Sequence, residues 1–238
     1  MYINDLVETH CHVLPGIDDG SKDVAESLEL ISLLKNQGAH KIICTSHYYS
    51  NEISLEHFVK RRNHAYEKLK KELPPDSPEL ILTAEVYMSK FFFTNEDISE
   101  LCVGSSRYIL VEHPFTSTFS DQTYDRLVNM CIDYRVVPIL AHIERYDALM
   151  NKKGKLEQYL DMGCLAQANI SSFVTGPRHI RKKLFKFLEE GKIQLVGSDC
   201  HNLTDRRPDY GPGMEEIRKR YGRSAVRELV ENANKITE

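Results

Sequence analysis

Short apolar segments alternate with helical patterns along this chain of 238 residues, and the alternation limits the folds that it can adopt. Strands that alternate with helices are typical of parallel strands joined by helical connections. The predicted strands cover residues 6–8, 41–45, 80–83, 108–111, 136–140, 165–168 and 194–196. The predicted helices cover residues 24–37, 55–73, 123–134, 156–162, 180–190, 214–220 and 225–234.

The domain organisation follows from what interrupts this alternation. The chain contains no internal repeat and no linker rich in Pro, Gly or Ser, and its 41% of hydrophobic residues can supply a core. We therefore predict an α/β barrel formed by one domain, residues 1–238. Two successive α/β halves are the alternative, which the lack of a boundary near the middle disfavours.

Composition excludes several classes of protein. The net charge is −4 with both signs interspersed, which argues against nucleic-acid binding. No apolar run approaches the length of a membrane span, and the N-terminus lacks a signal-peptide pattern. Six cysteines are scattered without a C-x-x-C pair, as in a reducing compartment. We expect a cytoplasmic protein without membrane insertion, and the sequence leaves the oligomeric state open.

Side chains that bind metals follow six of the seven predicted strands. His10 and His12 lie two residues apart, so in an extended strand they point to one side while Cys11 points away. The strands of a parallel barrel all end on the face that carries the active site, so these side chains should converge there. The sixth strand ends in Asn169 instead. The candidates are His10, His12, His47, Glu85, Glu112, His142, Asp199 and His201.

The number of these ligands predicts more than one metal ion. Five imidazoles and three carboxylates exceed what one ion binds, and they suit two or three ions bridged by carboxylates. Such sites activate water for displacement at phosphorus, with amide hydrolysis as the rival reaction. Arg145 and Arg206 follow two of the histidines and can bind phosphate with two hydrogen bonds each. For each arginine a surface salt bridge is the alternative.

Six motifs occur in order between residues 6 and 208: H-C-H-V-L-P-G-I-D-D-G-S, T-S-H-Y, A-E-V-Y, Y-I-L-V-E, A-H-I-E-R-Y and S-D-C-H-N. Together they resemble the bacterial capsule-associated tyrosine-protein phosphatases of the polymerase-and-histidinol-phosphatase (PHP) superfamily. The resemblance implies a distorted TIM-like barrel with seven βα units and a metal-dependent protein-tyrosine phosphatase. Ser46 and Ile143 depart from the family at positions where it tends to have proline.

The resemblance also implies roles for individual residues. It implies up to three manganese ions per chain, with iron, zinc, cobalt or magnesium as alternatives. The three implied ligand sets are His10, His12, Glu85 and Asp199; Glu85, Glu112 and His142; and Asp19, His47 and His201. Asp18 is the less suited alternative to Asp19. Arg145 and Arg206 would bind and neutralise the phosphate, although the pair Arg206-Arg207 leaves open which of the two does so.

The implied substrate is phosphotyrosine in the tail of a bacterial tyrosine kinase that controls capsular or exopolysaccharide synthesis. The basic segments 55–73 and 152–155 could bind such a tail or could be ordinary solvated faces. A histidinol-phosphate phosphatase with the same site is the main alternative, and a metal-dependent regulatory protein without activity is another.

A cysteine-dependent phosphatase must also be considered, because residues 200–206 match the pattern C-x5-R. That mechanism needs a glycine-containing loop whose backbone approaches the phosphate, and this segment contains no glycine. The neighbouring Asp199 would also disfavour a thiolate at Cys200. We therefore interpret the match as coincidence.

Overall fold

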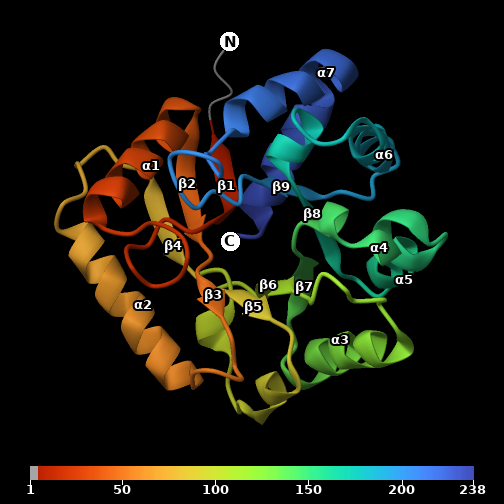
Figure 1. Ribbon diagram of the computed structural model, residues 1–238, viewed down its shortest axis with the longest axis horizontal. Helices are drawn as coiled ribbons and strands as arrows, with labels where there is room; N and C mark the ends of the chain where they lie inside the picture. The colour runs from red at the N-terminus through yellow and green to blue at the C-terminus, as the bar shows by residue number, and fades with distance from the viewer. Residues whose placement is uncertain (1–4) are drawn as a thin grey trace.

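The computed structural model describes residues 5–238, and its parallel strands curl into a distorted barrel with helices around the outside (Figure 1). The predicted domain begins at residue 1, so its first four residues lie outside the described part. The strands are β1 (Leu6–Cys11), β2 (Ala39–Cys44), β3 (His47–Tyr48), β4 (Glu79–Leu82), β5 (Glu85–Tyr87), β6 (Tyr108–Glu112), β7 (Val137–Leu140), β8 (Leu165–Asn169) and β9 (Leu195–Gly197).

The strands form two parallel sheets that meet at the first and last strands. One sheet has the order β1-β2-β4 and the other β3-β5-β6-β7-β8-β9. Backbone hydrogen bonds join the ends of β1 and β9, from His12 N to Cys200 O at 2.9 Å and from Asp199 N to His10 O at 2.7 Å. This closure brings the first and last ligand-bearing segments together and confirms the predicted distorted α/β barrel.

The two short strands β3 and β5 were not predicted. His47 and Glu85 begin these strands, whereas the sequence pattern placed both residues in loops after longer strands. Side-chain hydrogen bonds are formed by the residues between β2 and β3 and between β4 and β5. Thr45 Oγ1 donates to Cys11 O at 3.0 Å, and Thr83 Oγ1 donates to Leu101 O at 2.6 Å. Strands of two or three residues are too short to show alternation in a sequence.

The helices lie close to their predicted positions, except for the short helix α4, which was not predicted. They are α1 (Val24–Asn36), α2 (Leu55–Lys70), α3 (Asp121–Asp133), α4 (Asp147–Asn151), α5 (Lys155–Asp161), α6 (Arg178–Glu189) and α7 (Tyr210–Lys235). Asp23 caps α1 by accepting a hydrogen bond from Glu26 N at 3.0 Å. Gly222, with φ of 83°, bends α7 and turns the two helices predicted there into two arms of one element. Within residues 5–238, no helix is long and apolar enough to cross a membrane.

Short 3₁₀ helices fill the connections. They are η1 (Lys90–Thr94), η2 (Ser99–Leu101), η3 (Ile143–Arg145) and η4 (Ile170–Phe173). η1 contains three consecutive phenylalanines, of which Phe92 is fully buried and Phe91 is 46% exposed.

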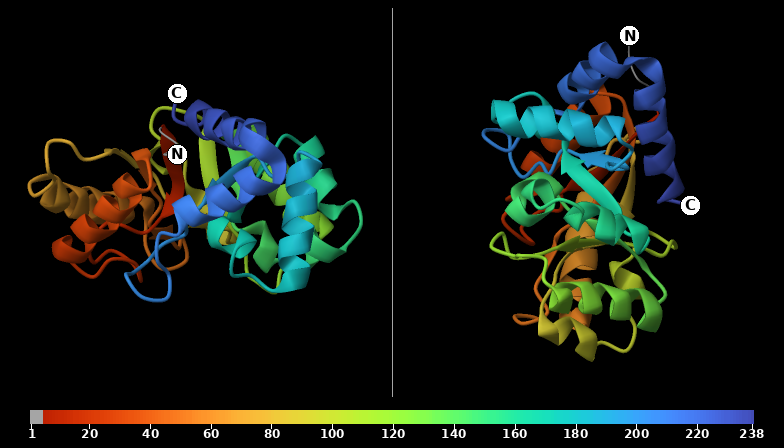
Figure 2. Two further views of the ribbon diagram at one scale, coloured as in Figure 1. Left: turned by 90° about the horizontal axis from the view of Figure 1, so that it is seen from above. Right: turned by 90° about the vertical axis from the view of Figure 1, so that its right-hand side faces the viewer.

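One apolar cluster fills the interior of the barrel. Six strands each contribute one side chain, and the C-terminal arm of α7 adds Ala233 and Ile236. The C-terminus accordingly lies at the centre of the ring of strands in Figure 1, and this arm lies against one end of the barrel in Figure 2. A larger cluster joins the strands to the surrounding helices. The six strand residues are Val7, Ile43, Ile81, Leu110, Ile139 and Leu195.

Candidate metal centre

Glu85 lies at the centre of the histidines gathered at the carboxyl ends of the strands. Its Oε2 atom lies 3.3 Å from His10 Nε2, 3.4 Å from His12 Nε2 and 3.0 Å from His47 Nδ1. Its other oxygen lies 2.9 Å from His142 Nε2. The Glu85 side chain is 1% exposed, and pairing with the histidines holds its pKa well below the usual range although burial alone would raise it.

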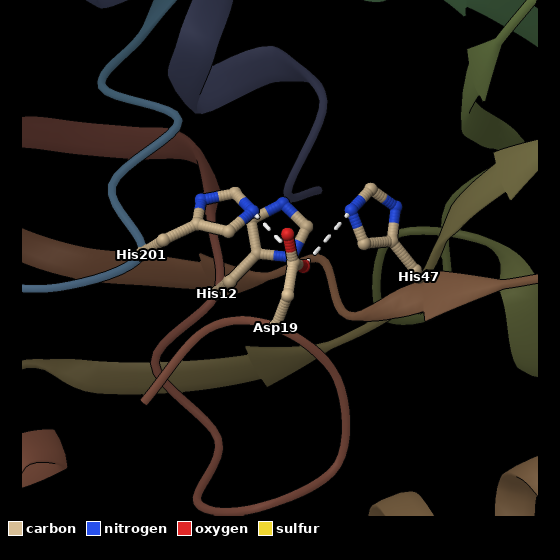
Figure 3. A group of neighbouring side chains, drawn as sticks. All are labelled: His12, Asp19, His47 and His201. Atoms are coloured by element: carbon tan, nitrogen blue, oxygen red, sulfur yellow. Dashed lines mark ion pairs between the residues drawn. The ribbon is translucent and has the colours of Figure 1, made fainter. Parts of the chain in front are cut away.

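A second group forms around Asp19 at the open side of the site (Figure 3). Its Oδ1 atom lies 3.3 Å from His201 Nε2 and 3.4 Å from His47 Nε2. Pairing with His201 and His47 lowers the pKa of Asp19. The Asp19 side chain is 63% exposed, and a cavity of about 420 Å³ adjoins it and His47. Solvent and ligands therefore reach this group directly.

Glu112 lies near two of the histidines that also contact Glu85. Its carboxylate oxygens lie 3.5 Å from His142 Nε2 and 3.9 Å from His47 Nδ1. Three overlapping groups have ligand atoms close enough to share an ion: His12, Asp19, His47 and His201; His10, His12 and Glu85; and His47, Glu85 and Glu112.

These groups overlap the sets that the family resemblance implies and differ from them in three places. His12 joins the group around Asp19, and His47 accompanies Glu85 and Glu112 where the resemblance implies His142. Asp199 belongs to none of the three groups. His142 still contacts both carboxylates of its implied set. All nine side chains therefore lie in one continuous cluster.

Asp199 is paired with two arginines. Arg145 donates to its Oδ2 at 2.6 Å and Arg206 to its Oδ1 at 2.8 Å, while Asn169 Nδ2 also donates to Oδ2 at 2.9 Å. Burial would raise the pKa of Asp199, but His10 and Arg145 hold it below the usual range. Both arginine side chains are about one-third exposed. Each guanidinium thus contacts the cluster and solvent.

Arg206 and Arg207 have different surroundings, one at the site and the other at the surface. Arg206 contacts both Asp199 and, at 3.7 Å, Asp19 Oδ2. Arg207 is exposed. Of the two, Arg206 is the one whose guanidinium faces the candidate metal centre.

Asp18 supports the cluster through hydrogen bonds to two of its histidines. Its Oδ2 accepts hydrogen bonds from His12 Nδ1 at 2.9 Å and from His47 N at 3.0 Å, and its Oδ1 accepts one from Gly20 N at 3.0 Å. Burial opposes both charges, yet their pairing raises the pKa of His12 to about 9 and lowers that of Asp18 to about 2. Asp18 therefore orients His12, whereas its neighbour Asp19 faces the histidine cluster.

Other groups fix ring orientation in the same way. His10 Nδ1 donates to Gln167 Oε1 at 3.3 Å, and His201 Nδ1 donates to Asp199 O at 3.0 Å. Each of these rings then turns its Nε2 atom toward the cluster, which is the usual arrangement of a metal-binding histidine and its outer partner.

The backbone is constrained around the ligands. His142 and Asp199 have positive φ angles of 33° and 53°, which non-glycine residues adopt rarely and mostly where the surroundings enforce them. Gly197 lies against β1, where an added Cβ atom would come within 2.6 Å of His10 Cβ. Glycine at this position lets β9 approach the histidine pair.

Two buried polar residues that support the site were not identified from sequence. Glu8 Oε1 accepts hydrogen bonds from His10 N and from Ser198 N, both at 2.9 Å, and so ties β1 to the end of β9. Gln167 Oε1 accepts a hydrogen bond from His142 N at 2.7 Å. The sequence feature that could have indicated their role is a charged or amide residue inside a predicted apolar strand. Neither residue belongs to a recognisable motif.

Five of the ten histidines lie outside the ligand cluster, and one of them, His113, is buried. His113 is 4% exposed, and burial lowers its pKa to about 3. Its backbone is held by Tyr146, whose hydroxyl accepts from His113 N at 2.9 Å. The five histidines in question are His40, His57, His64, His113 and His179.

The donor set fits hard or borderline metal ions. It contains imidazole nitrogens and carboxylate oxygens, which suit ions such as manganese, iron or zinc. Within residues 5–238, the buried ring nitrogens His47 Nδ1 and His201 Nε2 lie 3.0 Å from Glu85 Oε2 and 3.3 Å from Asp19 Oδ1, in ion-pair contacts that lack hydrogen-bond geometry. The thiols of Cys11 and Cys200 belong to the hydrophobic core instead. The cluster therefore has the composition of a metal centre, with imidazole nitrogens and carboxylate oxygens directed at one another.

Comparison with known proteins places the whole chain in one group. The family described as capsular polysaccharide synthesis, CpsB/CapC, matches residues 6–238. The tyrosine-protein phosphatase CpsB of Streptococcus pneumoniae is 30% identical over 251 aligned positions, covering 97% of this chain and 98% of the relative. The tyrosine-protein phosphatase YwqE of Bacillus subtilis is 25% identical, covering 96% and 90%.

A solved structure shares the fold. It comes from a study of YwqE from Bacillus subtilis and CpsB from Streptococcus pneumoniae, which that study describes as unique metal-dependent tyrosine phosphatases. It superimposes with a TM-score of 0.84 at 22% sequence identity and covers 98% of this chain and 94% of that chain. The similarity extends over the barrel and its helices together.

Proposed function

The chain belongs to the CpsB/CapC family of capsular polysaccharide synthesis, and from this premise we propose how its cluster acts and on what substrate. It is a metal-dependent tyrosine-protein phosphatase. The observation that carries the proposal is the joining of three potential ion-binding groups through His12, His47 and Glu85, with two arginines at their edge. Ions bridged in this way can activate water and neutralise the oxygens of a phosphate ester.

We assign the metal ligands to the nine predicted side chains, with manganese as the proposed ion. Up to three ions would be held, one for each of the overlapping groups. His142 and Asp199 would complete the groups that share Glu85, because they lie 2.9 Å from Glu85 and 3.4 Å from His10 respectively. The proposed ligands are His10, His12, Asp19, His47, Glu85, Glu112, His142, Asp199 and His201.

Arg145 and Arg206 are the proposed phosphate-binding residues. Both guanidiniums pair with Asp199, the carboxylate that would otherwise turn toward a cation. With a cation bound beside Asp199, the two arginines would be available to contact the phosphate oxygens of a substrate. They would then hold the phosphate beside the ions and stabilise the charge that develops on its oxygens.

Phosphotyrosine suits a site of this composition. Phenolate, with a pKa of about 10 for tyrosine, leaves phosphorus more readily than a serine alkoxide. The exposed side of the cluster around Asp19 gives access to a residue on a peptide. We propose that the physiological substrate is the tyrosine-rich tail of a bacterial tyrosine kinase that controls capsule synthesis.

We also propose a cytoplasmic location, which the six free cysteines of this chain support. Residues 1–238 are proposed as one domain.

The test compares three substrates on one preparation of the protein, with and without added Mn²⁺. They are a tyrosine-rich peptide carrying phosphotyrosine, the same peptide carrying phosphoserine, and histidinol phosphate. We expect the phosphotyrosine peptide to be hydrolysed fastest, chelation to abolish turnover and Mn²⁺ to restore it. A wide preference for histidinol phosphate would contradict the tyrosine-phosphatase assignment and leave a metal-dependent phosphoesterase for small substrates.

A further inference from the structure

An exposed phenylalanine stands at the edge of the metal centre. Phe115 is 55% exposed and is one of three exposed large hydrophobic side chains among residues 5–238. It follows Glu112 by three residues, in the loop between β6 and α3. Exposure of such a ring leaves apolar surface in water, which favours a role in binding when the ring borders a site.

The Phe115 ring lies against groups of the site on one side. Its centroid is 5.9 Å from that of His142 and 6.2 Å from that of Tyr146. The guanidinium carbon of Arg145 lies over the ring, 5.7 Å from its centroid. The phosphate-binding arginine proposed above therefore has an exposed aromatic ring beside it.

The loop that carries Phe115 is held in place. Ser117 N donates to Pro114 O at 2.7 Å, which closes a turn around Phe115. Next to it, the Tyr146 hydroxyl accepts a hydrogen bond from His113 N and donates to His113 O at 3.2 Å. The buried ring of Phe119 packs on Tyr146 with centroids 5.1 Å apart. The ring is thus presented by an ordered loop, with its open side toward solvent.

We propose that Phe115 binds the phenyl ring of phosphotyrosine substrates and so favours aryl over alkyl phosphate esters. The inference rests on the proposed function. A phosphate held by Arg145 is joined to the substrate ring through a single oxygen, so that ring lies within a few ångströms of the guanidinium. Aromatic pairs interact at centroid separations of about 4.5–7 Å, a spacing that a substrate ring beside Arg145 can reach from Phe115.

A purely structural role for Phe115 makes a different prediction. If the ring only held Arg145 in place through a cation–π contact, its loss would weaken the binding of every phosphate or phosphonate alike. If the ring binds the substrate, only ligands that carry an aromatic group lose affinity. Two inhibitors that differ in this group, phenylphosphonate and methylphosphonate, separate the two roles.

The experiment uses the full chain loaded with Mn²⁺ and measures the affinity of both phosphonates by calorimetry. Phe115→Leu keeps an apolar side chain and removes the ring, and Phe115→Tyr keeps the ring. We expect Phe115→Leu to weaken phenylphosphonate by about 5- to 20-fold and methylphosphonate by less than about 2-fold. Phe115→Tyr should retain the affinity of the wild-type protein. Ile132→Ala, an exposed hydrophobic residue on α3, is the matched control and should change neither.

Turnover gives a second reading. Phe115→Leu should lower kcat/KM for the phosphotyrosine peptide by a similar factor while leaving hydrolysis of an alkyl phosphate unchanged. Equal losses for both phosphonates, or no loss for either, would overturn the inference. Calorimetry requires no hydrolysis, so a wild-type protein that fails to act on phosphotyrosine contradicts the proposed function separately from the role of Phe115.

Discussion

The strands of the barrel carry opposite chemistry in its interior and at their carboxyl ends. Inside, Ile43 and Ile139 pack with other aliphatic side chains against Ile236 at the end of α7. At the carboxyl ends, Glu85 and Asp199 are buried among histidines and arginines. Both regions are almost inaccessible to solvent, but only one of them excludes charge.

The two regions differ in what stabilises them. Each buried aliphatic side chain contributes about 1.5–3 kcal/mol by leaving water, and this contribution needs no ligand. A buried carboxylate costs free energy unless it is paired, so the charged region depends on its own ion pairs or on bound cations. We therefore expect substitutions in the charged region to affect activity and substitutions in the apolar region to affect stability.

The largest effect is expected from Asp199→Asn. Removing one member of a buried charge cluster should lower kcat/KM by about 100- to 10,000-fold and reduce the metal content. Asparagine tolerates the positive φ of this position, so the barrel should remain folded. Elemental analysis, circular dichroism and hydrolysis of the phosphotyrosine peptide check the three parts. Full activity with unchanged metal content would remove Asp199 from the proposed ligands.

The next effect tests the arginines at the edge of the charged region. Arg145→Ala or Arg206→Ala should lower kcat/KM by about 10- to 1,000-fold, because each removes a charge-assisted contact to phosphate. Metal content should hardly change. Arg207→Ala is the matched control, since Arg207 is exposed beside Arg206. A loss for Arg207→Ala as large as that for Arg206→Ala would contradict the proposed division between the two residues.

The barrel could be predicted from sequence because apolar runs alternate with helical patterns, and six of the seven predicted strands are followed by a ligand-type residue. Strand β7 illustrates this, since the run Val137–Leu140 ends shortly before His142. Convergence of the ligand-type residues follows from the parallel arrangement and needs no knowledge of individual contacts. The short strands β3 and β5 escaped prediction because two or three residues show no period.

The family resemblance favours Asp19 over Asp18, but the residue pattern alone could not make this choice. Both are adjacent acidic residues in one turn, and only the fold of that turn places Asp18 behind His12 and Asp19 toward His201. Glu8 and Gln167 escaped for a related reason, because their roles consist of hydrogen bonds to backbone atoms of distant segments. Contacts of this kind leave no pattern along the chain.

A substitution in the apolar region should give the converse result. Ile43→Ala, at a fully buried position, should lower the free energy of unfolding by about 2–5 kcal/mol. At 25 °C the folded fraction should retain the kcat/KM and metal content of the wild-type protein. Urea denaturation and activity corrected for the folded fraction measure both. A loss of metal at full folding would show that the two regions are coupled.

The smallest effect on activity is expected from Cys200→Ser. Cys200 lies between Asp199 and His201 in the sequence. Its side chain is nevertheless fully buried in the hydrophobic core beside Cys11, and so it belongs to the apolar surroundings and not to the charged region. Serine places a hydroxyl in that environment, so some stability should be lost, about 1–3 kcal/mol. The kcat/KM of the folded variant should stay within about 3-fold of the wild-type value, because the buried Cys200 thiol does not act as the nucleophile in the proposed reaction. A thiolate mechanism requires the opposite result, complete loss of turnover with folding and metal content intact, and that outcome would move Cys200 from the core into the reaction.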